Sequence, residues 1–89
     1  MAKYLVIHPV GQELNMEESG PGAKALKAAM TTDAYWLGSE YCREAGKIYC
    51  HWDAKDADSI RQVLARAAPD LPTEGIYEIE LAVDSEDYR

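Results

Sequence analysis

Residues 34–67 read AYWLGSEYCREAGKIYCHWDAKDADSIRQVLARA, and this stretch predicts a strand hairpin followed by a helix. Aromatic and β-branched residues recur in 34–42 and 48–52, and they favour extended backbone. The turn between these segments contains Gly46, which can adopt the positive φ that tight hairpins require. Two adjacent antiparallel strands therefore precede the helix.

The helix in this stretch has the clearest periodicity in the chain. Ile60, Val63, Leu64 and Ala67 recur at i, i+3, i+4 and i+7, which places them on one apolar face. Asp56 stands just before the pattern, where its carboxylate can cap the first turn. We therefore expect an amphipathic helix that packs on the hairpin.

The segments on either side complete the pattern. Residues 3–8 predict a first strand, and residues 76–81 predict a last one. Between the first strand and the hairpin, residues 20–30 are rich in alanine and lysine and predict a short helix. Pro21 favours a start near residue 20, because proline is tolerated in the first turn of a helix and disrupts its interior. Residues 84–89 form a charged tail.

The order strand, helix, strand, hairpin, strand, helix, strand predicts an α+β fold of the ferredoxin-like βαββαβ kind. Right-handed crossovers then give an antiparallel four-stranded sheet in the order 4-1-3-2, with both helices on one face. Residues 1–83 make one domain. With 89 residues in the chain, the core is limited in size, and such small domains gain stability by pairing.

Alternation along the strands predicts which side chains face the helices. Towards the helices we expect Leu5, Ile7, Ile48, Cys50, Trp52, Tyr77, Ile79 and Leu81. The open face of the sheet then carries Tyr4, Val6, His8, Tyr49, His51, Ile76, Glu78 and Glu80. A mixed apolar patch on a small domain is typical of an interface, and we predict a homodimer packed sheet to sheet through this face. The alternative is a plain solvated face.

Composition excludes several classes of partner. The net charge of −7 opposes binding to a phosphate backbone, so we expect no nucleic acid partner. No apolar run approaches the length of a membrane span. The first residues lead directly into a strand pattern without the regions of a signal peptide, so we expect a cytoplasmic protein.

Chemically active side chains are few. His8 should lie beside Glu78, and an imidazole next to a carboxylate can bind a divalent ion or act as a general base. The alternative for His8 is an ordinary hydrogen bond at the end of a strand. Cys50 and His51 are adjacent and point to opposite faces, so they cannot share a metal. Cys42 and Cys50 are expected to be reduced thiols. With Ala45 and Gly46 as a two-residue turn they face opposite ways, whereas a three-residue turn could align them.

Several short motifs carry a resemblance to a known family. They are residues 36–39 (WLGS), 44–47 (EAGK), 48–50 (IYC), 53–54 (DA), the helix at 57–68, 71–72 (LP) and 76–79 (IYEI). Through them the chain resembles a family of small bacterial domains described as nickel-binding, closely over residues 34–81. His8 is similar to a histidine in the first strand of that family. Many relatives carry histidines late in the second helix, where this chain has Leu64 and Ala68, and His51 is an addition.

The resemblance implies a dimeric ferredoxin-like α/β barrel that binds Ni²⁺ or another divalent ion. Our leading hypothesis is a non-catalytic homodimer that binds such a metal or a small ligand, with His8, Glu78 and either Cys50 or His51 as candidate ligands. The second is a cofactor-free enzyme, such as a monooxygenase or isomerase, with His8 as general base in a cavity on the open face. The third is a purely structural or regulatory dimer.

Overall fold

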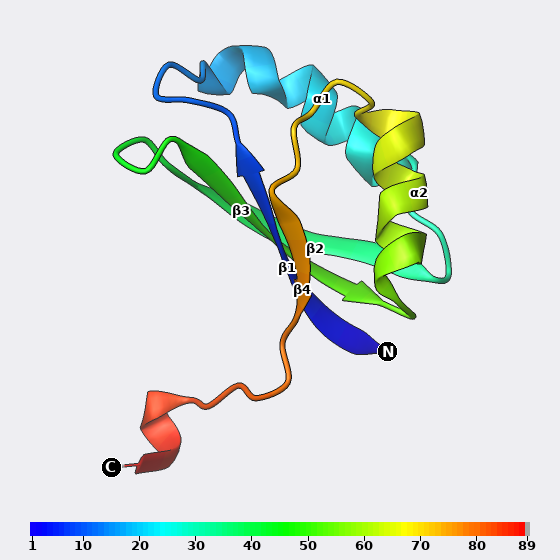
Figure 1. Ribbon diagram of the computed structural model, residues 1–89, viewed down its shortest axis with the longest axis vertical. Helices are drawn as coiled ribbons and strands as arrows, with labels where there is room; N and C mark the ends of the chain where they lie inside the picture. The colour runs from blue at the N-terminus through cyan, green and yellow to red at the C-terminus, as the bar shows by residue number, and fades with distance from the viewer. Residues whose placement is uncertain (89) are drawn as a thin grey trace.

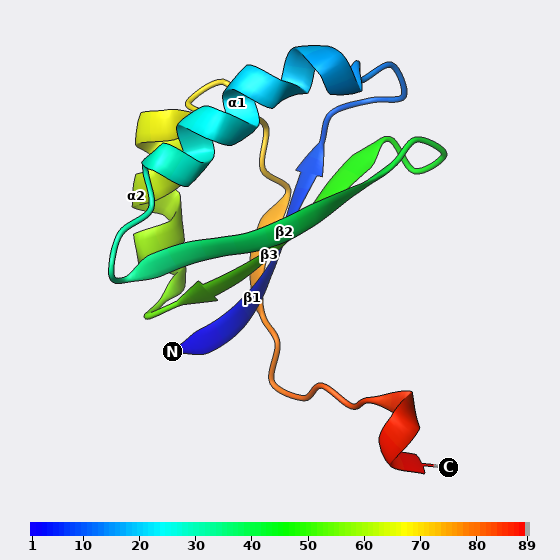
Figure 2. The same ribbon diagram turned by 180° about the vertical axis from the view of Figure 1, so that it is seen from behind.

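The computed structural model describes residues 1–88, apart from the side chain of Met16, and shows one antiparallel sheet with two helices over one of its faces (Figure 1). The elements are β1 (Ala2–Pro9), α1 (Met16–Ala28), β2 (Ala34–Cys42), β3 (Lys47–Ala54), α2 (Ala57–Ala67), β4 (Gly75–Glu78) and a short 3-10 helix, η1 (Ser85–Tyr88). The view from behind also places both helices on the same side of the sheet (Figure 2). The α+β class and the predicted order of elements are confirmed.

The strand order is β2-β3-β1-β4, and all three pairs are antiparallel. Read from the β4 edge, this is the order 4-1-3-2. The turn between β2 and β3 contains Gly46, whose φ is +68°. A Cβ at Gly46 would lie 3.3 Å from the backbone of Gly11, so the absence of a side chain lets the hairpin tip approach the end of β1.

α1 begins one turn before the start near Gly20 that the sequence predicts. The side chain of Asn15 caps it by accepting hydrogen bonds from the backbone N–H groups of Glu17 and Glu18, at 2.9 and 3.3 Å. The two carboxylates also lie in the first turn, where the helix dipole favours negative charge. Pro21 therefore lies inside the helix, and the cap outweighs the backbone hydrogen bond that proline cannot donate.

β1 turns the opposite side chains towards the helices from those that alternation predicts. The side chains beneath the helices are all buried: Tyr4, Val6 and His8. Both alternating sets of β1 are apolar, so the pattern alone does not distinguish them. The register with β3 does, because Val6 lies opposite Cys50 and residues opposite each other share a face. Leu5 and Ile7 lie on the open face instead.

The prediction for β3 is confirmed, since Cys50 and Trp52 are buried under the helices. The prediction for β4 is wrong. Ile76 packs against the core, whereas Tyr77 is 50% exposed on the open face and lies opposite Leu5. The Tyr77 ring folds back over Gly75, at a position that a Cβ would occupy.

The core lies between the helices and the sheet. Its buried members are Tyr4, Val6, Leu26, Ala34, Cys50, Trp52, Ala54, Ile60, Val63 and Leu64. α2 supplies three of them and packs as its periodicity predicts, with Asp56 accepting a hydrogen bond from the N–H of Ser59 at 2.8 Å. Packing of α2 therefore accounts for much of the core.

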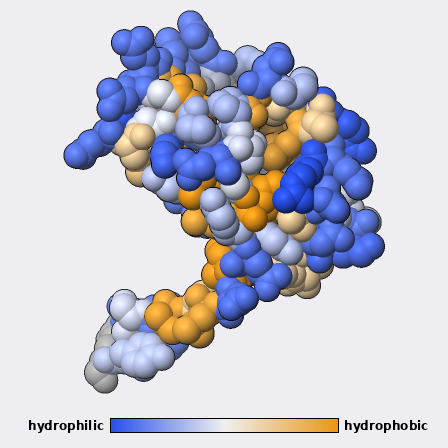
Figure 3. Space-filling view, in the orientation of Figure 1, coloured by the Kyte–Doolittle hydropathy of each residue, from blue (hydrophilic) through white to orange (hydrophobic). Residues whose placement is uncertain are grey.

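β4 is shorter than the predicted strand at 76–81. A last backbone bond joins the N–H of Ile79 to the carbonyl of Lys3 at 2.8 Å. β1 begins at Ala2, so the residues that follow have no strand beside them, and the chain leaves the body of the molecule (Figures 1 and 3). Leu81 is 81% exposed there. The predicted tail contains η1, and its last residue, 89, lies outside the described residues. Within residues 1–88, no helix is long and apolar enough to cross a membrane.

Candidate functional site

An apolar cavity of about 410 Å³ lies between α1 and the sheet. Its walls are side chains of α1, of β1 to β3 and of the segment after α2. Two of the four predicted site residues, His8 and Cys50, line it. The cavity is on the helix-covered face, so the expectation of a cavity holding His8 on the open face is wrong.

Small residues on α1 leave this space open. The inward face of the helix is formed at i, i+3, i+4 and i+7 by Ser19, Gly22, Ala23 and Leu26. Only the last of these is large, and Leu26 is also the one that is buried in the core. Between Ser19 and Ala23, the described side chains of α1 that face the cavity are therefore too small to fill the gap beneath them.

Two side chains of the hairpin region fix the loop that leads into α1. The Tyr41 hydroxyl donates to the carbonyl of Gly11 at 2.7 Å and accepts from the N–H of Leu14 at 3.4 Å. Arg43 donates to the carbonyls of Gln12 and Leu14 at 2.6 and 3.3 Å. These bonds tie the loop before α1 to the end of β2 and to the hairpin turn, and so fix the loop at this end of the cavity.

His8 is the polar group on the floor of the cavity and is only 1% exposed. Its Nδ1 lies 3.1 Å from the carbonyl oxygen of Pro72 and 3.2 Å from the Thr73 hydroxyl. A carbonyl can only accept, so Nδ1 carries the proton and Nε2 is an acceptor. Burial lowers the pKa of His8 below its ordinary value of 6.5, and the bond to Pro72 opposes that shift. The ring is therefore neutral at pH 7.

Cys50 lies beside this histidine on the neighbouring strand. Its Sγ is 2.7 Å from the Ser39 hydroxyl, which accepts a hydrogen bond from the Trp36 indole N–H at 2.8 Å. Burial raises the pKa of the Cys50 thiol, a shift that the Ser39 contact opposes and the nearby Glu40 carboxylate increases. The thiol is thus protonated at neutral pH and is a poor metal ligand as it stands.

Glu78 lies far from His8. The register pairs Glu78 with Tyr4, and the Tyr4 hydroxyl donates to the Glu78 carboxylate at 3.4 Å. Burial, followed by the charge of Glu78, raises the pKa of Tyr4. His8 lies at the other end of β1, opposite Ile48. The prediction that His8 and Glu78 are neighbours is wrong, because the antiparallel register places Gly75, the first residue of β4, opposite Ile7 and places Glu78 opposite Tyr4.

His51 lies on the open face of the sheet. Its Nε2 is 2.9 Å from a carboxylate oxygen of Glu40, and both side chains are well exposed, at 41% and 63%. An imidazole and a carboxylate that meet on an accessible surface are two donors suited to a borderline divalent ion. The structure thus separates the two histidines, one to each face of the sheet.

The surroundings of this pair are partly apolar. Leu5, Ile7, Tyr49 and Tyr77 lie on the same open face and are only partly covered. Cys42 is also on this side, exposed and free, and Cys50 is free on the other, so the two thiols face opposite ways as predicted. The open face therefore combines an apolar centre with one polar pair.

Sequence reasoning missed Glu40. A two-residue turn at Ala45 and Gly46 would place Glu40 directly opposite His51. In the structure Glu40 lies opposite Tyr49, one diagonal step from His51, because the pairing begins at Cys42 and Lys47 and bulges near Gly38. Either register brings the two side chains within reach. The predicted pairing of the two hairpin strands could therefore have identified Glu40 as a partner of His51.

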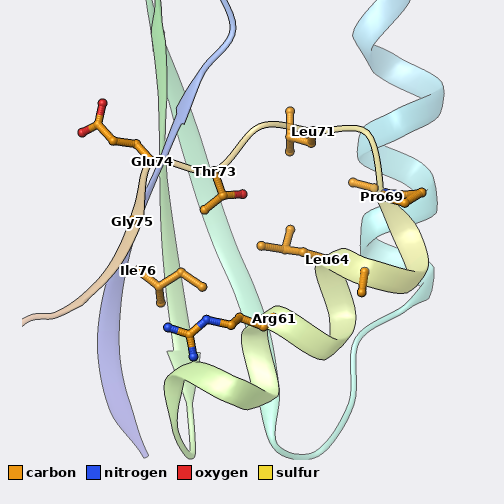
Figure 4. Close-up of a pocket in the computed structure, with 10 residues that line it drawn as sticks. Arg61, Leu64, Pro69, Leu71, Thr73, Glu74, Gly75 and Ile76 are labelled. Atoms are coloured by element: carbon orange, nitrogen blue, oxygen red, sulfur yellow. The ribbon is translucent and has the colours of Figure 1, made fainter.

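A second hollow of about 370 Å³ lies between α2 and β4. Figure 4 shows Leu64 and Thr73 pointing into it, while the carboxylate of Glu74 points away. That carboxylate pairs with Lys47 at 2.8 Å. Arg61 is held by Asp58 of its own helix. The polar groups around this hollow are thus occupied, and it offers less chemistry than the cavity beneath α1.

The fold and these groups define a class: a small α+β domain with one sheet face under helices, the other bare, and a histidine on each. The chain belongs to the family described as nickel responsive protein, SCO4226-like, which matches residues 4–79. The resemblance seen in the motifs is thereby confirmed. The crystal structure of SCO4226 from Streptomyces coelicolor A3(2) is similar, with a TM-score of 0.79 and 18% sequence identity over 92% of this chain and 100% of that one. No curated protein matches the chain.

Proposed function

We propose that this protein binds Ni²⁺ or a similar divalent ion as a homodimer, through the exposed pair of His51 and Glu40. The observation that carries the proposal is the 2.9 Å contact between these two donors on the bare face of the sheet. Membership of a nickel responsive family supports the choice of metal. Imidazole and carboxylate donors suit such an ion, since Ni²⁺ accepts nitrogen and oxygen ligands.

The other candidate ligands are less suitable in this conformation. His8 is buried and holds a carbonyl with one ring nitrogen, and Cys50 is a protonated thiol. Glu78 is engaged by Tyr4. Binding an ion at Cys50 or Glu78 requires a proton or a hydrogen bond to be given up, and His8 is enclosed beneath the helices. His51 and Glu40 exchange their mutual hydrogen bond for bonds to the metal, with the His51 proton moved to Nδ1, and they do so on an accessible surface.

One subunit does not complete the site. Within residues 1–88, no three His, Cys, Asp or Glu side chains gather as a metal-binding group. The remaining ligands are then water or a second copy of the same pair. A dimer that covers Leu5, Ile7, Tyr49 and Tyr77 would bury apolar area that a lone subunit exposes, and it would bring two copies of the pair to one interface. This is the α/β-barrel arrangement that the resemblance implies.

The experiment is a calorimetric titration with Ni²⁺, combined with sedimentation velocity on the same samples. We expect stoichiometric binding by a dimer. His51→Ala should abolish binding, because it removes one of the two donors. Leu5→Glu should give monomers and weaken binding at least tenfold, because it places a charge at the centre of the open face.

The matched control is His8→Asn, which changes the other histidine of the chain and retains a donor to the Pro72 carbonyl. It should bind Ni²⁺ as the unmodified protein does. Binding that survives in His51→Ala but disappears in His8→Asn would move the metal to the cavity beneath α1. Heat of binding that is absent with Ni²⁺, Co²⁺, Cu²⁺ and Zn²⁺ alike would refute metal binding altogether.

A further inference from the structure

The cavity beneath α1 is a built feature of the fold. Gly22 and Ala23 leave room on the helix side, and Tyr41 and Arg43 hold the preceding loop in place. Interiors of proteins are normally close-packed, and a cavity of this size falls within the range of sites for small organic ligands. Because four residues together keep this space open, we regard it as a candidate ligand-binding site.

The walls define the chemistry of that occupant. They are predominantly apolar, with Leu26, Trp36, Ile48 and Leu71 among them. Among the lining residues there is no lysine or arginine, and the chain carries a net charge of −7. An anionic ligand would find no countercharge there, so the lining favours a neutral, apolar molecule.

His8 provides a hydrogen-bonding group at a fixed position in the wall of the cavity. Nδ1 of His8 is tied to Pro72 and Thr73, which fixes the ring and its tautomer. Nε2 makes no hydrogen bond with any part of the chain described by the structure. This nitrogen is an acceptor in the wall of the cavity, and a donor on a ligand can form a hydrogen bond with it.

We propose that the cavity binds a neutral aromatic or alicyclic molecule that bears a hydroxyl group, with the hydroxyl donating to Nε2 of His8. Glu40 of the proposed metal pair also borders this cavity, but His51 does not, so the two proposals are separated at His51. The hydroxyl pairs with the free ring nitrogen of His8, while the ring system occupies the apolar space beneath Ala23.

The test uses 2-naphthol, with naphthalene and 2-naphthoate for comparison, followed by ¹H–¹⁵N NMR and calorimetry. We expect one site for 2-naphthol with a Kd below about 1 mM, and binding about tenfold tighter than that of naphthalene, which lacks the donor. 2-Naphthoate should not bind measurably. The indole N–H of Trp36, which lines the cavity, should shift, whereas that of Trp52, which does not, should stay in place.

Two pairs of variants separate the site from general effects. Ala23→Leu fills the cavity from α1 and should abolish binding of 2-naphthol. Ala25→Leu makes the same change in the same helix, at a residue that does not line the cavity, and should leave binding unchanged. His8→Asn keeps the donor to Pro72 but lacks Nε2, so it should bind 2-naphthol and naphthalene equally well.

His51→Ala should retain the full affinity for 2-naphthol, which keeps this test distinct from the metal experiment. No binding of 2-naphthol by the unmodified protein would overturn the proposal, since it would mean that α1 closes the space in solution. Equal binding by Ala23→Leu and Ala25→Leu would also overturn it, and so would shifts confined to residues of the open face.

Discussion

Each face of the sheet carries a histidine, but the two histidines have different roles. On the helix-covered face, His8 is 1% exposed, fixed by Pro72 and Thr73, and kept neutral by burial. On the open face, His51 is accessible and meets the Glu40 carboxylate. The environment, more than the side chain, decides whether an imidazole accepts from a buried ligand or joins a carboxylate at the surface.

The comparison extends to the apolar residues. Trp52 and Val6 beneath the helices are fully buried, whereas their neighbours Tyr49 and Ile7 on the open face are only partly covered. Burial within the chain stabilises a single subunit, and the partly covered residues can contribute fully only when another surface meets them. The covered face therefore serves folding, and the open face is the surface through which we propose association.

The largest expected effect tests this division directly. Trp52→Ala should lower the free energy of unfolding by about 3–5 kcal/mol, because it removes a large side chain from the core. Tyr49→Ala, on the same strand but the other face, should cost about 1 kcal/mol or less in dilute, monomeric protein. Urea unfolding followed by circular dichroism measures both. Similar costs for the two variants would show that the faces are not distinct in this way.

The next effect concerns the two histidines. The pKa of His8 is lowered in the folded protein, so the unfolded chain takes up the proton more readily as the pH falls below 6.5. Stability is thus complete above pH 6.5 and declines as the pH falls towards the lower pKa of the folded state, with a slope of at most about 1.4 kcal/mol per pH unit.

Urea unfolding between pH 8 and pH 5 checks this dependence. His8→Asn should remove the decline that the unmodified protein shows over this range, since asparagine does not titrate. His51→Asn, the matched change on the open face, should leave it in place. If the decline persists in His8→Asn and disappears in His51→Asn, the loss of stability at low pH is caused by His51 and not by His8.

Much of the fold could be predicted from the sequence where two signals agree. α2 has both a clean apolar face and the Asp56 cap, and β2 spans the predicted Ala34–Cys42. The signals for α1 disagree: Pro21 favours a late start of the helix, whereas Asn15 caps an early one. Local signals that compete cannot be ranked without the hydrogen bonds that decide between them.

The candidate site was predicted less well, for a physical reason. Both alternating sets of β1 are apolar, so only the register with β3 reveals that His8 faces the helices. A register shift of one residue exchanges the two faces of a strand. The cavity could not be predicted at all, since it depends on how far α1 stands from the sheet. Ser19, Gly22 and Ala23 at helical spacing were its one visible sign.

The smallest effect concerns the support of that cavity. Tyr41→Phe removes the hydroxyl that bridges Gly11 and Leu14, and should cost about 1 kcal/mol of stability. The expected local effect is faster amide exchange at Leu14, because its N–H loses its partner. Tyr77→Phe is the matched control, since the Tyr77 hydroxyl on the open face makes no hydrogen bond with the described part of the chain, and it should change neither quantity.

The two bonds from Arg43 to the same loop remain in Tyr41→Phe, so the loop should loosen without detaching. Affinity for 2-naphthol should then fall by a few-fold and not vanish, because the walls supplied by α1 and the sheet are unchanged. An unaltered exchange rate at Leu14 would show that Arg43 alone holds the loop. The cavity would then depend on one side chain of the hairpin, and Arg43→Ala would be the variant that closes it.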